Sequence, residues 1–251
     1  MIGMVLAAGT GRRLRPHTDG RPKALLPVAG ETTILDLALR NLAESGLADV
    51  VIVVGYAAEM VADRIPALER AYGLSIDLVY NERAEEWNNA YSLWLAREYF
   101  RRGVMLVNGD TVHPASVEKT LLAASAAIKP DPVLGRLIIA IDDIKSLADE
   151  EMKVVLDDER MLLRITKVMD PVHAHGEYMG VTLIEPTAAV ALADCLEATW
   201  RGNPHLYYED AFAEFSERGG AVLGASIGMV DWVEVDDLAD LHRAREIASR
   251  C

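Results

Sequence analysis

The sequence predicts one α/β domain with a doubly wound, mostly parallel sheet and a mixed second half. Two observations lead to this prediction. In the first half of the chain, apolar runs of strand length alternate with amphipathic helical stretches, which is typical of a parallel sheet with helices on both faces. In the second half, several strand-like segments follow one another before helices resume, so antiparallel pairs are expected there. No repeat or linker divides the 251 residues.

The first half contains four segments that predict strands, of which the first two are expected to be buried. The first, Ile2–Ala8, is continuously apolar apart from one glycine and ends at Gly9, which fits a strand buried on both faces. The other three strands are expected at Asp49–Gly55, Ser75–Asn81 and Val104–Asp110.

Helices are expected between these strands. The first is capped by Thr32 or Thr33 and carries its apolar residues on one stripe. The next stretch, Ala57–Tyr72, contains Pro66, which should break or kink it. A third helix is expected at Asn89–Phe100.

The second half predicts a different arrangement. Strands are expected at Arg136–Asp142, at Glu177–Pro186 and over Lys153–Val168, the last as a hairpin turning at Asp157–Arg160. Further elements are helices at Pro186–Trp200 and Tyr207–Arg218, short strands near Val222 and at Trp232–Val235, and a closing helix from about Asp236 to Ser249.

Composition excludes several classes of function. The formal net charge of -14 argues against a nucleic-acid-binding surface. The two cysteines, Cys195 and Cys251, have no zinc-like spacing, so neither a disulfide framework nor a structural metal site is expected. No apolar run approaches the roughly 20 residues that span a bilayer, and the N-terminal run lacks the basic start of a signal peptide. We therefore expect a cytoplasmic protein without nucleic-acid or membrane partners, and leave a homodimer open.

Basic residues gather in the segment after the first strand, in spite of the acidic composition. They are Arg12, Arg13, Arg15, Arg21 and Lys23. A local basic cluster in an acidic protein suits a small polyanionic ligand, although an exposed arginine-rich loop would have the same composition. In parallel sheets ligands bind beyond the carboxyl ends of the strands, and this segment follows such an end, as does the "NGD" after the fourth strand.

Three known phosphate loops fit this segment poorly. A dinucleotide loop needs a third glycine, but Leu14 stands at that position, and the acidic residue expected after the second strand is missing. A Walker loop needs Gly-Lys-Ser/Thr, whereas Lys23 lies between Pro22 and Ala24. A methyltransferase loop shares "GTG" but would lead into a helix without this basic, proline-bearing tail.

The remaining interpretation uses the whole segment to grip a nucleoside triphosphate. Gly9 and Gly11 allow the backbone N–H groups to approach the phosphates closely. Arg13 would neutralise the β- and γ-phosphates, and two prolines stiffen the loop so that Lys23 reaches the α-phosphate.

These residues resemble the nucleotidyltransferase family that activates sugar phosphates and related alcohol phosphates. The match to L-A-A-G-x-G-x-R-L-x-P-x-T-x-x-x-P-K-x-L-x-x-V-x-G is complete over Leu6–Gly30. The resemblance implies a Rossmann-like (GT-A-like) fold in which residues 1–112 bind the nucleotide, with Leu6, Ala7 and Ala8 in contact with it, and residues 113–251 bind the acceptor.

The resemblance also implies Mg²⁺ on two aspartates, one after the fourth strand and one near the C-terminus. Asp110 and Asp236 match these positions, with Asp237 as an alternative to the second. Each has a plain structural alternative: Asp110 would cap a turn, and Asp236 would cap the last helix.

The stretch "YNERAEEWNNAYSLW", Tyr80–Trp94, distinguishes branches of the family. Hexose enzymes usually carry a glutamine and a P-x-G-x-A segment there. The N-x(6)-N-N-x-Y-S-L pattern instead resembles CTP-using enzymes for phosphocholine, inositol phosphate and phosphonates, which implies Asn81, Asn89 and Ser92 as nucleotide contacts. The alternative for Asn89 is a helix cap.

The acceptor pocket is expected from the second half. The candidates are Lys153, Lys167, Glu177, Tyr178 and Tyr208. A lysine would hold the acceptor's phosphate or phosphonate, although solvated strand lysines are an equal alternative. Phosphocholine would need an aromatic cage, for which the candidates are Tyr178, Tyr207, Tyr208 and Trp232.

Two acidic or metal-like features stay open. Glu209 and Asp210 would serve a second metal or an amine, or simply begin a helix. His173 and His175 have i, i+2 spacing, but without a third ligand a surface turn is preferred.

The predicted reaction is transfer of CMP from CTP to a small phosphorylated alcohol or phosphonate, with Lys23, Arg13 and Asp110 as catalytic residues and Mg²⁺ as cofactor. The alternatives are a sugar-1-phosphate enzyme using UTP or dTTP, a non-catalytic nucleotide-binding regulator, and an NAD- or SAM-binding enzyme.

Overall fold

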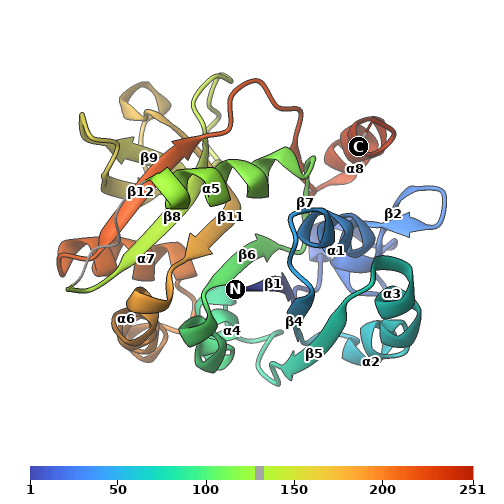
Figure 1. Cartoon of the computed structure of the whole chain (residues 1–251). Helices are drawn as coiled ribbons and strands as arrows, with labels where there is room; N and C mark the ends of the chain where they lie inside the picture. The colour runs from blue at the N-terminus through green and yellow to red at the C-terminus, as the bar shows by residue number, and fades with distance from the viewer. Residues whose placement is uncertain (128–132, 251) are drawn as a thin grey trace.

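The computed structural model describes residues 1–127 and 133–250, so Cys251 lies outside the described residues. Its centre is a nine-stranded mixed sheet with helices on both faces (Figure 1). The fold class predicted from the sequence is therefore confirmed.

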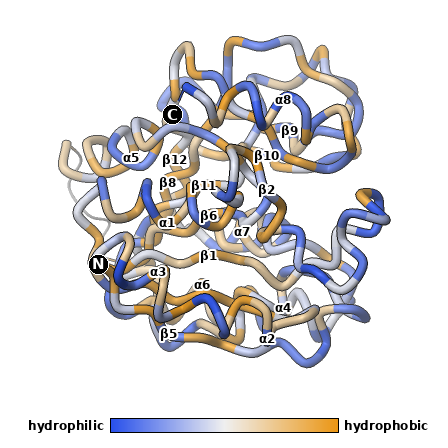
Figure 2. The backbone as a smooth tube through the Cα atoms, turned by 90° about the vertical axis from the view of Figure 1, so that its right-hand side faces the viewer, coloured by the Kyte–Doolittle hydropathy of each residue, from blue (hydrophilic) through white to orange (hydrophobic). Residues whose placement is uncertain are grey.

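The first half forms the parallel part of the sheet. Its strands lie in the order β5 (Ser75–Tyr80), β4 (Asp49–Val54), β1 (Ile2–Ala7) and β6 (Val104–Asn108). All four were predicted. β1, β4 and β6 are apolar runs that are buried almost throughout, whereas β5 at the edge of the sheet is only partly buried. Figure 2 shows β1 as a mostly hydrophobic stretch in the middle of the molecule, with hydrophilic segments in peripheral loops.

The second half continues the sheet with mixed directions. Strand β11 (Gly176–Ile184) runs antiparallel to β6 and to β8 (Arg136–Asp142), and β12 (Ala221–Ser226) is parallel to β8. The predicted hairpin is present as β9 (Lys153–Leu156) and β10 (Leu162–Thr166). It joins the sheet at the start of β11, through Gly176 and Glu177.

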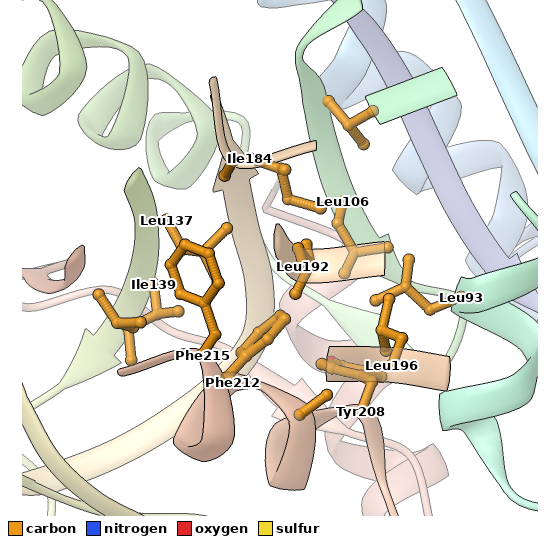
Figure 3. Close-up of a cluster of buried hydrophobic side chains, with 14 of the residues drawn as sticks. Leu93, Leu106, Leu137, Ile139, Ile184, Leu192, Leu196, Tyr208, Phe212 and Phe215 are labelled. Atoms are coloured by element: carbon orange, nitrogen blue, oxygen red, sulfur yellow. The ribbon is translucent and has the colours of Figure 1, made fainter. Parts of the chain in front are cut away.

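The helices divide between the two faces. One face carries α1 (Ile34–Glu44), α2 (Ala58–Ala62), α3 (Ile65–Tyr72) and α5 (Ser116–Ala127), and the other carries α4 (Asn89–Leu95), α6 (Ala189–Gly202) and α7 (Tyr208–Glu217). Figure 3 shows the core under the second group, where aromatic residues of α7 meet aliphatic side chains of the sheet and of α6.

Three helix predictions are refined by the structure. The break before Pro66 is real, but the proline lies in the first turn of α3, where its missing N–H costs nothing. The predicted Asn89–Phe100 helix ends at Leu95 and continues as a 3₁₀ turn, Arg97–Arg102. Helix α5 was not predicted, because its alanines and serines leave no clear apolar stripe.

A small third core ties the opening loop to the end of the chain. Its elements are β2 (Pro27–Ala29), β3 (Thr32–Thr33), β7 (Thr111–Val112), β13 (Val233–Glu234) and α8 (Leu238–Ala248). Leu14 of the loop packs in the same cluster as Val112, Val235 and Leu241, all buried. Figure 1 shows the C-terminal helix α8 beside β7 and β2. Burial of this cluster fixes the opening loop against residues 233–248.

Among the described residues, no helix combines the length and apolarity that crossing a membrane would require.

Candidate active site

The loop after β1 is built to place Lys23. Gly11 has φ +60°, and the Thr18 hydroxyl donates to its carbonyl at 2.8 Å, which closes the loop on itself. A short 3₁₀ turn, Lys23–Leu25, then begins directly after Pro22, so the lysine side chain points inward and is only 11% exposed. A Cβ on Gly9 would meet no atom within 4 Å, so its backbone borders open space.

The Lys23 ammonium lies between two carboxylates. Its Nζ donates to Asp110 Oδ2 at 3.0 Å and to Asp236 Oδ1 at 2.8 Å. Arg13 Nη2 reaches the other oxygen of Asp236 at 2.7 Å. The structure thus brings together the two loop residues, Lys23 and Arg13, and the two aspartates, Asp110 and Asp236, that the sequence assigned to catalysis and metal binding.

Two short strands bring the carboxylates to the loop. β7 and β13 pair antiparallel with Thr111 opposite Glu234, and the Val235 N–H donates to the Asp110 carbonyl at 2.9 Å. Gly109 permits the approach to β1, because a Cβ there would lie 2.5 Å from the Leu6 carbonyl oxygen. The site therefore depends on backbone pairing between distant segments.

The structure distinguishes between Asp236 and Asp237. The Asp237 carboxylate accepts from the N–H groups of Ala239 and Asp240 and caps α8 in a capping box. Asp236 precedes the cap and faces Lys23 instead. The residue that caps the last helix is therefore Asp237 and not Asp236.

Glu234 completes a cluster of three carboxylates that the sequence analysis missed. Ligand atoms of Asp110, Glu234 and Asp236 lie within 4.8 Å of one another. Because Glu234 and Asp236 are separated by two positions at the end of a strand, their side chains share one face. That i, i+2 spacing is the signal in the sequence that would have found Glu234.

The charges in this cluster depend on one another. Burial opposes the charged form of Lys23, but the carboxylates of Asp110 and Asp236 outweigh it and raise the lysine's pKa. Burial likewise favours neutral Asp236, yet Lys23 and Arg13 lower its pKa. Burial together with Asp110 and Asp236 raises the pKa of Glu234 to about 8. Lys23 and Arg13 thus neutralise most of the negative charge of the three carboxylates.

The cluster fits a divalent cation. Carboxylate oxygens are the ligands that hard cations such as Mg²⁺ prefer. Asp110 Oδ1 is buried and has no hydrogen-bond partner among the described residues, so it has an unused lone pair at the centre of the cluster. A metal ion would compete there with the Lys23 ammonium.

A cavity of about 270 Å³ adjoins this cluster. The first half of the chain contributes Leu6, Ala8, Gly9, Ala84, Trp87, Asn88, Asn89, Ser92 and Asn108 to its lining. The second half contributes Met152, Lys167, Tyr178, Gly180, Tyr207 and Glu209. Arg13, Asp110, Glu234 and Asp236 lie on its wall as well, so one cavity links both halves with the charged cluster.

Not every predicted nucleotide contact lines this cavity. Asn89 and Ser92 do, but Asn81 is buried beside it and donates from Nδ2 to the Ser92 hydroxyl at 2.8 Å. Asn88 caps α4, whereas Asn89 Oδ1 accepts from the Tyr208 N–H at 3.0 Å. Asn89 therefore joins the two halves of the chain at the cavity wall. Ala7 and Gly11 are outside the cavity lining, in the strand and loop behind it.

Lys167 and Tyr178 line the cavity, but Lys153, Glu177 and Tyr208 are corrected by the structure. The Lys153 side chain is fully buried and donates to the carbonyls of the turn before β9, Ala148, Asp149 and Glu151. Glu177 is paired with Lys145 at 2.5 Å, outside the cavity. Tyr208 is a core residue whose hydroxyl donates to Asn108 Oδ1 at 2.9 Å. The sequence pattern could not reveal these local partners.

The four aromatic candidates for a phosphocholine cage, Tyr178, Tyr207, Tyr208 and Trp232, do not all line one cavity. Trp232 lies in a different hollow, where its Nε1 donates to Asp142 and Lys145 covers its ring. Tyr178 and Tyr208 meet edge to face in the core. The aromatic residues among those that line the cavity are Trp87, Tyr178 and Tyr207.

A mixed α/β sheet with a parallel first half, a glycine-bearing basic loop after its first strand and a carboxylate cluster at the carboxyl ends of its strands define a protein that handles nucleotide phosphates. The chain belongs to the nucleotidyl transferase family, whose sequence profile matches residues 2–135.

Curated relatives and solved structures agree with this assignment. The CMP-5'-(3-aminopropyl)phosphonate synthase of Streptomyces rubellomurinus is 33% identical over 96% of this chain, and the choline-phosphate cytidylyltransferase of Streptococcus pneumoniae is 39% identical over 39% of it. These matches span 38% and 40% of the relatives' own lengths. The inositol-1-phosphate CTP transferase of T. maritima has the same fold, with a TM-score of 0.79, 21% identity and coverage of 98% of this chain and 94% of that one.

Proposed function

We propose that this protein transfers CMP from CTP to a small phosphorylated alcohol or phosphonate and releases pyrophosphate. The observation that carries the proposal is the convergence of Lys23 with three carboxylates at the junction of a cavity lined by both halves of the chain. Residues 1–112 would bind the nucleotide and residues 113–251 the acceptor.

The reaction needs positioning and charge neutralisation rather than a general base. An anionic oxygen of the acceptor's phosphate or phosphonate attacks the α-phosphorus, the new P–O bond forms, and the bond to the β-phosphate's bridging oxygen breaks. Lys23 would stabilise the charge at the α-phosphate, and the half-exposed Arg13 the leaving pyrophosphate. Both side chains form ion pairs with Asp236. A bound triphosphate would compete with Asp236 for these two cations.

Mg²⁺ is the proposed cofactor, held by Asp110, Glu234 and Asp236. When bound, it supplies charge neutralisation at phosphoryl oxygens. In its absence the Lys23 ammonium takes that part within the cluster.

The choice of cytosine follows from the relatives that use CTP and from the asparagine-rich stretch before α4. Asn89 and Ser92 line the cavity. Lys167 lines it as well and is the cation that would hold the acceptor's phosphate or phosphonate.

A pyrophosphate-release assay tests the proposal with four nucleoside triphosphates against phosphocholine, inositol 1-phosphate, alkylphosphonates and glucose 1-phosphate, each with Mg²⁺. We expect release with CTP and one of the small acceptors, and none in Asp110→Asn. Preference for UTP or dTTP with glucose 1-phosphate would favour the sugar-nucleotide alternative.

A further inference from the structure

One side-chain amide on the cavity wall has no part in the proposed transfer. Asn108 is the last residue of β6, two positions before Asp110, and lines the cavity. Its Oδ1 accepts from the Tyr208 hydroxyl at 2.9 Å, whereas its Nδ2 has no hydrogen-bond partner among the described residues. Nδ2 is not one of the polar atoms that are sealed from solvent. Its two N–H groups are therefore donors that a molecule in the cavity can reach.

The backbone of β11 leaves room for this amide. Gly180 also lines the cavity and has φ +83°. A Cβ at this position would lie only 2.6 Å from Asn108 Nδ2. The amide nitrogen thus lies against bare backbone of the second half of the chain, the half that also contributes Lys167 to the cavity lining.

A chain of three buried hydroxyls reaches Asn108 from the core. Thr182 Oγ1 lies 2.7 Å from the Tyr178 hydroxyl, which lies 3.0 Å from the Tyr208 hydroxyl. All three residues are at most 2% exposed. Burial raises the pKa of both tyrosines, so each phenol keeps its proton at neutral pH. The chain therefore carries three hydroxyl protons, each of which needs an acceptor.

The direction of these hydrogen bonds decides which atom of Asn108 faces the cavity. If each hydroxyl donates toward Asn108, all three protons have acceptors and the last one is Oδ1. If the amide were flipped, so that Nδ2 donated to Tyr208, one hydroxyl proton would be left over, because the Thr182 hydroxyl has no second partner among the described residues. A buried hydroxyl without an acceptor is destabilising. The buried hydroxyls therefore fix the amide with its N–H groups toward the cavity.

The backbone of Tyr208 fixes a second amide in the same way. Its N–H, which can only donate, lies 3.0 Å from Asn89 Oδ1. The two asparagines thus contact one tyrosine through their carbonyl oxygens, Asn89 at its backbone and Asn108 at its hydroxyl. Removal of the hydroxyl alone would therefore release Asn108 and leave Asn89 in place.

We infer that Asn108 Nδ2 donates a hydrogen bond to a phosphate or phosphonate oxygen of the acceptor, and that Tyr208 is the positioning residue that orients it. The inference rests on the proposed function. Phosphoryl oxygens only accept hydrogen bonds, so an amide N–H attracts them where an amide oxygen would repel them. Because Nδ2 borders Gly180 of the second half, we assign this bond to the acceptor and not to the nucleotide.

The first test removes the amide with Asn108→Leu, which keeps the approximate shape of the side chain. The acceptors are phosphocholine, inositol 1-phosphate and methylphosphonate, each with CTP and Mg²⁺. We expect KM for the acceptor to rise at least ~10-fold while KM for CTP is unchanged, the scale for losing a hydrogen bond to a charged group. The factor should be the same for every acceptor that the parent uses, because these acceptors share only the phosphoryl end. An unchanged KM for the acceptor, or a rise confined to CTP, would overturn the inference.

A second variant covers the case in which Asn108→Leu does not fold. Asn108→Asp keeps an acceptor for the Tyr208 hydroxyl and replaces the N–H donors by a carboxylate oxygen. Its KM for the acceptor should rise on the same scale, and an unchanged value would contradict the inference.

The second test separates positioning from stability. Tyr208→Phe should raise KM for the acceptor at least ~3-fold in the parent but cause no further rise in Asn108→Leu, because the two residues act as one unit. Tyr72→Phe, which removes a buried hydroxyl that donates to Asp36 at 3.1 Å, is the matched control and should leave both KM values unchanged. Equal rises for Tyr208→Phe in both backgrounds, or a similar rise in Tyr72→Phe, would contradict the positioning role.

Failure of the proposed function has a different outcome. If no acceptor releases pyrophosphate from CTP with the parent, the proposed reaction is wrong. In that case a titration with methylphosphonate decides the inference, followed by NMR through the side-chain amide resonances of Asn108, which Asn108→Asp assigns. A shift of these resonances supports the inference, and resonances that do not move overturn it.

Discussion

The ammonium of Lys23 lies 2.8 Å from Oδ1 of Asp236, although 213 positions separate them in the sequence. The same ammonium is 3.0 Å from Asp110. One lysine thus holds together the carboxylates that a metal ion would need, and it is also the residue expected to act on the triphosphate. A metal ion would therefore compete with Lys23 for the carboxylates of Asp110 and Asp236, and a bound triphosphate would compete with these carboxylates for Lys23.

Lys23→Ala should affect turnover and metal binding in opposite directions. We expect kcat to fall at least ~100-fold, the scale for losing one preorganised charge. Without nucleotide, the variant should bind Mn²⁺ more tightly, because the competing ammonium is gone. Steady-state kinetics and calorimetric titration with Mn²⁺ measure the two effects. Lys119→Ala, on an exposed position of α5, is the control, and near-normal turnover in Lys23→Ala would contradict the assignment.

Asp236→Ala and Asp237→Ala should separate chemistry from stability. Loss of Asp236 removes a carboxylate of the cluster, so kcat should fall at least ~100-fold with Mg²⁺. Loss of Asp237 removes the cap of α8 and should cost about 1 kcal/mol of unfolding free energy with little change in kcat. Denaturant unfolding measures the free energy of unfolding of each variant, and pyrophosphate release measures its kcat. The reverse pattern would assign the metal site to Asp237.

Two glycines with similar backbone angles test how the loop positions Lys23. Gly11 and Gly20 have φ of +60° and +69°, so alanine strains both positions by roughly 1 kcal/mol. Only at Gly11 would the new Cβ press on Lys23, whose Cβ is 3.1 Å away. We expect a larger loss in melting temperature for Gly11→Ala, because its Cβ would also lie 2.9 Å from Thr18 Cγ2 while Gly20 has open space. A fall in kcat of ~10-fold or more is expected for Gly11→Ala alone. Equal kcat values for Gly11→Ala and Gly20→Ala would show that contact with the Gly11 position does not control where Lys23 lies.

Glu118 gives a pH dependence of stability. Burial raises its pKa, only partly offset by His113, whose Nδ1 is 3.7 Å away. The folded state therefore holds this proton more tightly than the unfolded state, so the stability contribution is complete below pH ~4.5 and is lost as pH rises through the folded pKa. The amide of Glu118→Gln does not ionise, so this variant does not lose that stability as the pH rises. Its melting temperature should exceed that of the parent by roughly 2–4 °C at pH 8, and by less at pH 5.

The control for this prediction is Glu98→Gln, whose side chain is 76% exposed. Its melting temperature should equal that of the parent at pH 5 and at pH 8. A constant difference between Glu118→Gln and the parent from pH 5 to pH 8 would mean that Glu118 does not change its protonation on folding.

The sequence by itself determined the parallel half of the sheet, because its buried strands are continuous apolar runs such as Ile2–Ala7. It also determined the opening loop, since Gly11 and Lys23 stand in one local segment whose chemistry is readable without partners. The family follows from the same segment.

Only the tertiary structure decided which acidic residues meet. Asp236 and Asp237 look equivalent in sequence, and backbone pairing of β7 with β13 together with the cap of α8 separates their roles. Glu234 joins the cluster for the same reason. Lys153 resembled a ligand-binding lysine, but three carbonyls of its own turn enclose it. Local patterns encode secondary structure, whereas burial and long-range packing determine where each charge lies.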